Sequence, residues 1–148
     1  MRGEKIMNIE ELINKANNFN KEQIRKYNPD MEFLHEIAWN AGIRLAREYG
    51  ANENIVKIAL AMMDSKLPEA SSLGVAKEHI LMASNVTKEM LEDVSCFNEK
   101  EKENIIKCVE EHHGVKKFYS IESEIVANAD CYKFVSPKGI LYYSSMLG

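Results

Sequence analysis

The sequence has only three cysteines, and none of them forms a closely spaced motif. Cys96, Cys108 and Cys131 form no CxxC pair, and their number is odd. Small secreted domains that lack a large core usually depend on several disulfides. We therefore expect no disulfide framework, and a reducing, cytoplasmic location suits this chain best.

Long apolar runs and a strongly basic surface are also absent. The longest uninterrupted apolar stretch runs from Ile58 to Met63, far short of the roughly 20 residues that span a membrane. The first residues, MRGEKIMNIEEL, lack the apolar run of a secretory signal. A net charge of −4 offers no broad positive field for a nucleic acid polymer. A small phosphorylated ligand is still compatible, because it needs only a local cation or a metal.

What the sequence does contain is helical periodicity along nearly its whole length. No alternating run is long enough to predict a sheet, and no internal repeat is present. Hydrophobic residues make up 45% and charged residues 28%, which is ordinary for a soluble globular protein. We predict an all-α fold, a single-domain bundle of about six to seven helices over residues 1–148.

Capping residues predict where several helices begin. Asn8 with Glu11 and Asn98 with Glu101 match the capping box, in which each side chain bonds the other residue's backbone N–H. Asn52 is expected to cap a helix that is too apolar for the surface and therefore central.

Other helix boundaries follow from glycine, proline and hydroxyl residues. Asp30 is expected to cap a long helix that Gly50 ends. The segment 65–74 is expected to be a loop, followed by a helix over 75–84 and a short one from Thr87 to 94. The last strong helix is expected to start at Ser120 and to end before Pro137, with a short helix or turn after it.

Histidines and aspartates are spread over these helices in a way that suggests a metal site. Bundles hold metals through side chains of facing helices, which lie far apart in the sequence. Mixed imidazole and carboxylate ligands suit divalent first-row metals. The candidate ligands include every histidine of the chain: His35, Asp64, His79, His112, His113 and Asp130.

The order of these residues resembles the HD-domain superfamily of metal-dependent phosphohydrolases. The likeness covers roughly residues 27–134. His35 corresponds to the first histidine, Met63-Asp64 to the His-Asp doublet, His79 in AKEHILMAS to an additional histidine, CVEEHHG to a later histidine motif, and Asp130 in SIESEIVANADCYKF to the final aspartate.

The resemblance implies hydrolysis of a nucleotide or another small phosphate ester with a divalent metal, which would be Mn, Fe, Co, Ni, Zn or Mg. The metal would polarise the phosphate and lower the pKa of a water molecule. Asp64 and Lys66 are the expected catalytic residues, Lys66 as a positive charge for the phosphate.

The departure from the family pattern is Met63, which stands where the doublet has histidine. A thioether suits soft ions rather than the harder metals of this chemistry. In family branches with additional histidines, the doublet's aspartate bridges two metals. The resemblance then implies one intact half-site and one weakened half-site: Asp64, His79, His112 and His113 in the first, His35 and Asp130 in the second.

Several alternatives remain open at this point. Asp130 can pair with Lys133 rather than with a metal, because a buried carboxylate needs some partner. His112 and His113 also fit a helix C-terminus, where positive charge is favoured. The chain can accordingly be a phosphohydrolase, a catalytically impaired HD-like ligand-binding or regulatory module, or a helical protein whose histidines are incidental.

Overall fold

The structure is a computed structural model that describes residues 6–147. These residues form eight α-helices and no strand, which confirms the predicted all-α fold class. None of the helices in this range is long and apolar enough to cross a membrane. The helices are α1 (Ile9–Tyr27), α2 (Glu32–Tyr49), α3 (Glu53–Met62), α4 (Leu67–Ser72), α5 (His79–Leu91), α6 (Glu99–Glu110), α7 (Ile121–Val135) and α8 (Pro137–Leu147), with 3-10 turns at Pro29–Met31 and Ala76–Glu78.

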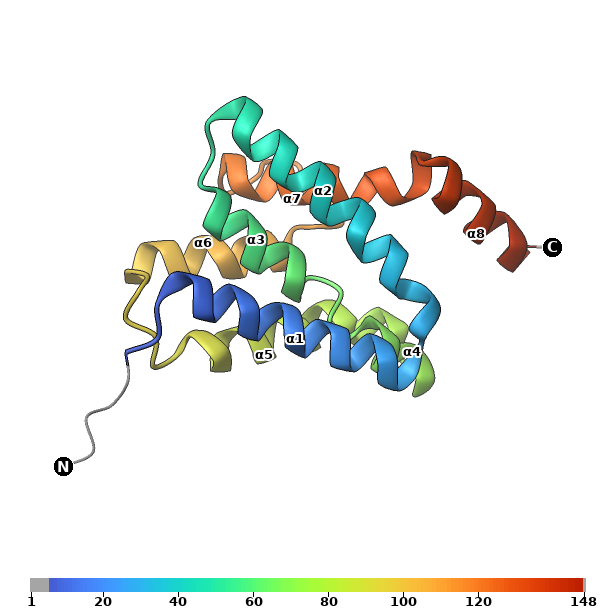
Figure 1. Cartoon of the computed structure of the whole chain (residues 1–148), viewed down its shortest axis with the longest axis horizontal. Helices are drawn as coiled ribbons and strands as arrows, with labels where there is room; N and C mark the ends of the chain where they lie inside the picture. Colours follow the sequence, from blue (N-terminus) through green and yellow to red (C-terminus); the bar gives the residue numbers. More distant parts are fainter. Residues whose placement is uncertain (1–5, 148) are drawn as a thin grey trace.

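Helix α3 is the centre of the bundle. It packs against α1, α2, α6 and α7, so that α2 and α7 cover one side and α1 lies on the other (Figure 1). The residues from Ile58 to Met62 in this helix, and Met63 directly after it, are at most 1% exposed. Gly42 lets α2 approach closely, because a Cβ there would lie 2.5 Å from Leu60 of α3. The apolar run that the sequence marks as central is therefore buried on all sides, which is what an all-round hydrophobic helix requires.

The predicted caps are largely confirmed. Both capping boxes form, and the Asn52 side chain accepts hydrogen bonds at the start of α3. The Ser120 hydroxyl accepts a bond from the backbone N–H of Ser123 at the start of α7. Gly50 ends α2 with a φ of 65°, a conformation that glycine adopts without steric cost.

Three helix boundaries differ from the sequence prediction. Asp30 lies inside the 3-10 turn before α2 and makes no side-chain cap. The expected loop over 65–74 contains the six-residue helix α4, with Pro68 in its first turn, where proline is tolerated. Thr87 does not begin a helix: its hydroxyl donates to the Ala83 carbonyl inside the continuous helix α5. A hydroxyl that bonds back to the preceding turn leaves the helix intact.

The last helix, α8, packs mainly on α7 and extends away from the bundle (Figure 1). Its Tyr142 ring meets Phe33 of α2 edge-on, with ring centroids 5.4 Å apart. The Tyr143 ring stacks on Phe134 of α7 at 4.8 Å. The expected short C-terminal helix is therefore eleven residues long and anchored by aromatic contacts.

Candidate metal centre

Asp64 lies in the turn that follows the central helix. α3 ends at Met62, and the Ser65 hydroxyl donates a 2.8 Å hydrogen bond to the Met62 carbonyl. The backbone N–H of Leu67 donates to the Asp64 carbonyl at 3.0 Å. These bonds fix the turn, so the Asp64 side chain has a defined direction in the middle of the bundle.

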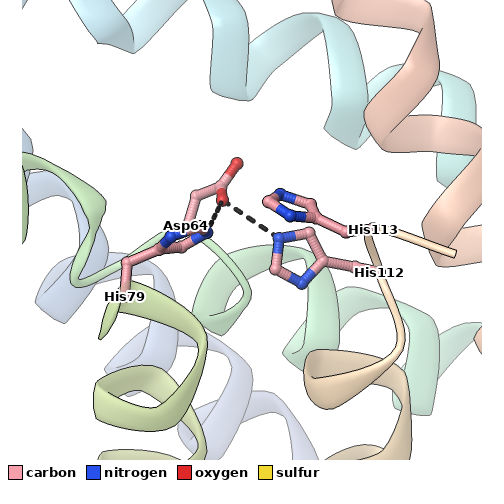
Figure 2. Close-up of side chains that lie close together, drawn as sticks. All are labelled: Asp64, His79, His112 and His113. Atoms are coloured by element: carbon pink, nitrogen blue, oxygen red, sulfur yellow. Dashed lines mark hydrogen bonds and ion pairs between the residues drawn. The ribbon is translucent and has the colours of Figure 1, made fainter. Parts of the chain in front are cut away.

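Three imidazole rings surround one oxygen of this carboxylate. His79 is the first residue of α5, and His112 and His113 lie in the turn after α6 (Figure 2). Nε2 of His112 is 3.2 Å from Oδ1 of Asp64, and Nε2 of His79 is 3.5 Å from the same atom. The ring of His113 stands beside both, with centroids 4.3 Å from His112 and 5.1 Å from His79.

Backbone carbonyls fix the protonation of two of these rings. Nδ1 of His79 is 2.7 Å from the Ala76 carbonyl, and Nδ1 of His112 is 2.6 Å from the Val109 carbonyl. A carbonyl can only accept, so each Nδ1 carries the proton and donates it. When these rings are neutral, each Nε2 is unprotonated and its lone pair points toward Asp64. Metal-binding histidines are commonly oriented by such a bond from the other ring nitrogen.

The lone pairs of these two Nε2 atoms face the negatively charged oxygen of Asp64, so they repel it unless a cation lies between them. His79 is 95% buried, and its Nε2 has no hydrogen-bond partner. A proton on His112 can relieve one of the two contacts: burial alone would lower the pKa of His112, but its hydrogen bond with Asp64 raises it above the ordinary value. That proton leaves Nε2 of His79 unsatisfied. A metal ion would satisfy both nitrogens and the carboxylate at once.

The ligand set fits a divalent metal. Asp64, His79, His112 and His113 each offer one ligand atom, and these atoms lie within 4.8 Å of one another. Imidazole and carboxylate ligands are those that Zn, Mn, Fe, Co and Ni use. Burial and the neighbouring charge of His112 lower the pKa of His113, which keeps its ring available as a neutral ligand.

The other oxygen of Asp64 has a different neighbour. Oδ2 accepts a hydrogen bond from the ammonium group of Lys133, which also donates to Oδ1 of Asp130 at 2.7 Å. Burial alone would raise the pKa of Asp64, but Lys133 and the two imidazoles hold it well below its usual range. The partner that the sequence suggested for Asp130 is therefore confirmed. The second bond of Lys133, to Asp64, could not be predicted from the sequence, because these two residues lie 69 positions apart.

His35 lies on the side of Asp64 that faces Lys133, apart from the cluster of Asp64, His79, His112 and His113. It lines a cavity of about 20 Å³ together with Met63, Asp64 and Lys133. Burial, and next the charge of Lys133, lower its pKa to about 4. The structure thus groups Asp64, His79, His112 and His113, and it places His35 and Asp130 around Lys133 instead.

Lys66, the expected phosphate contact, points to a local partner. Its ammonium group lies 2.8 Å from Glu69 and 5.3 Å from the centre of the Phe19 ring. The hydrogen bond from Lys66 lowers the pKa of Glu69. Contact with a phosphate would require Lys66 to exchange this carboxylate for the ligand, so its catalytic role stays a prediction.

Comparison with known proteins supports the fold. No family model and no curated protein matches the sequence. A crystal structure of a predicted HD superfamily hydrolase from an uncultured Thermotogales bacterium does match, with a TM-score of 0.76 over 95% of this chain and 82% of that chain. The chain therefore shares the fold of this predicted HD superfamily hydrolase. At 18% identity the likeness shows a common architecture, and the chemistry depends on the residues of the site.

Proposed function

We propose that this HD-fold protein is a metal-dependent phosphohydrolase, acting in the cytoplasm on a nucleotide or another small phosphate ester. The observation that carries the proposal is the convergence of two carbonyl-oriented Nε2 atoms, of His79 and His112, on one oxygen of Asp64. A buried nitrogen without a donor is costly, and a protein retains one where a ligand supplies the missing contact.

The ligands we assign to the metal are Asp64, His79, His112 and His113. Bound there, a divalent ion supplies polarisation of a phosphoryl oxygen and a lowered pKa for a coordinated water molecule. The exposed ring of His113 lies at the solvent side of the cluster, so a substrate would approach past this residue. Asp64 would hold the ion through its carboxylate, which Lys133 fixes through Oδ2.

Substrate binding draws on local positive charge rather than on a basic surface. The chain has a net charge of −4, and Lys66 is the cation two residues after Asp64. We assign Lys66 to the phosphate, with Glu69 as the partner it leaves when substrate binds. A divalent ion and one lysine suffice for a small phosphate ester, whereas a nucleic acid polymer would need many more contacts.

The test combines metal analysis with an activity screen. Protein purified and reloaded with Mn²⁺, Co²⁺, Ni²⁺, Zn²⁺ or Mg²⁺ is expected to bind one ion and to hydrolyse at least one nucleotide or generic phosphate ester. H79A is expected to lose both the ion and the activity, while the matched variant H35A keeps the ion. Unchanged metal content in H79A would contradict the proposed centre.

A second function has one observation in its favour. The side of Asp64 that faces His35 is filled by Met63 and Lys133, neither of which is a ligand for a hard metal. A centre with metal but no hydrolysis of any substrate in the screen would favour a ligand-binding or regulatory module. Activity that appears only in M63H would show that Met63 disables an otherwise complete site.

A further inference from the structure

Two buried carboxylates share one ammonium group on the second side of the centre. Lys133 is 5% exposed and Asp130 is 6% exposed. The ammonium group bonds Oδ2 of Asp64 and Oδ1 of Asp130, so it bridges side chains from the α3–α4 turn and from α7. Buried carboxylates are stable only when cations compensate them. Here the compensating cation is part of the chain.

The space around this ammonium group is too small and too apolar for an additional hydrated ion. The adjoining cavity has a volume of about 20 Å³, which is room for a single water molecule. Apolar side chains, including Met63, Leu34 and Leu60, form much of its wall. Divalent ions of the harder kind take oxygen and nitrogen ligands. The donors in this wall are Asn20, His35 and Asp64, and Oδ2 of Asp64 already accepts a hydrogen bond from Lys133.

We propose that the ammonium group of Lys133 takes the place of a second metal ion, so that the centre binds one metal only, on the imidazole side of Asp64. This inference rests on the proposed metal centre and adds the residue that sets its stoichiometry. Lys133 is a positioning residue: by holding Oδ2 it directs Oδ1 of the same carboxylate toward the histidines.

The neighbouring His35 is consistent with this assignment. Its ring lines the same small cavity as Asp64 and Lys133, together with the amide side chain of Asn20. Without the ammonium group, His35, Asp64 and Asp130 would present one imidazole and two carboxylates to the same space, a set that suits a divalent ion.

The test is the metal stoichiometry of four proteins, measured by elemental analysis and by titration with Co²⁺. Wild type and M63H are expected to bind one ion, because Lys133 remains. M63H/K133A is expected to bind two, because removing the long side chain frees both carboxylates and the space that the ammonium group fills. M63H/K133R is the matched control, which keeps the positive charge and is expected to bind one.

A second measurement uses the wild type and does not depend on how the variants fold. With excess Mn²⁺, its electron paramagnetic resonance spectrum is expected to show an isolated ion and no exchange-coupled pair. A coupled pair in the wild type would overturn the inference. So would two ions in M63H alone, or one ion in folded M63H/K133A.

Failure of the proposed centre gives a different pattern. A wild-type protein that binds no ion, or one whose single ion survives H79A, contradicts the imidazole site itself and the inference with it. Metal binding that is lost in H79A, together with a coupled pair in the wild type or two ions in M63H, contradicts only the role of Lys133.

Discussion

The two oxygens of Asp64 face two different kinds of cation site. On the imidazole side, Oδ1 meets His79 and His112, with His113 beside them at the surface. On the lysine side, Oδ2 meets Lys133, a permanent charge tethered to α7. One carboxylate can therefore bind an exchangeable metal ion through one oxygen and the ammonium group of a lysine side chain through the other.

The two sides also differ in the backbone that supplies them. The imidazoles come from helix ends, where each Nδ1 reaches the carbonyl three residues earlier: Ala76 for His79 and Val109 for His112. Lys133 and Asp130 come from the interior of α7, one turn apart. Carbonyls in a turn or at a helix C-terminus can accept an imidazole N–H, whereas a helix interior holds two side chains at a fixed spacing.

The largest effect is expected from D64A, because this change removes the residue that both sides share. The variant should bind no metal and should lose about 3 kcal/mol or more of unfolding free energy, since Lys133 remains buried with one partner fewer. Elemental analysis and urea unfolding would measure the two losses.

D130N separates the two sides and serves as the control for D64A. Asp130 contacts Lys133 but is not one of the four clustered ligands. We expect D130N to lose stability and to keep its metal. Loss of the ion in D130N would mean that the two sides cannot be treated separately.

The next largest effect should distinguish the two adjacent histidines. H112Q removes a side chain that is 1% exposed and bonded to Val109, so it should lose metal affinity and about 1–3 kcal/mol of stability. H113Q, at the exposed ring, should lose affinity by at least about tenfold while stability changes by less than about 0.5 kcal/mol. Isothermal titration and thermal unfolding would compare them. Equal loss of stability in both variants would contradict the assigned burial of the pair.

Much of the imidazole side could be predicted from the sequence, and the reason is local. The order of the ligands resembles a known family pattern, and His112 and His113 end a predicted helix. The sequence did not mark His79 as the start of α5, because no side chain caps that helix. The fold class followed from helical periodicity in the same way, and the structural match confirms it.

The lysine side could be predicted only in part. The pair of Asp130 and Lys133 has a signal, because residues three apart on a helix are neighbours. The bond from Lys133 to Asp64 has none, because it depends on how α7 packs on α3. The helix α4 was missed for a related reason: its six residues are too few to show periodicity, and Pro68 and the serines resemble a loop.

A smaller effect is expected on substrate binding from K66A, which leaves both sides of Asp64 in place. We expect KM for the phosphate substrate to rise by about tenfold, because a charged contact to the phosphate is lost, with metal content unchanged. E69Q is the matched variant: it frees Lys66 from its carboxylate partner and should lower KM. Steady-state kinetics would measure both. A KM unaffected by K66A would remove Lys66 from the site.

The smallest effect is expected from M63L, which tests what the methionine contributes to the lysine side. Met63 is 1% exposed and belongs to the hydrophobic core, and leucine has a similar volume. Such volume-conserving exchanges usually cost less than about 1.5 kcal/mol. If Met63 only packs, M63L should bind the same single metal and hydrolyse substrate at about the wild-type rate, as titration and kinetics would show. If its sulfur is instead a ligand, M63L should lose metal affinity, since leucine has no donor atom. Retention of the ion in M63L would leave Lys133 as the residue that separates the two sides of Asp64.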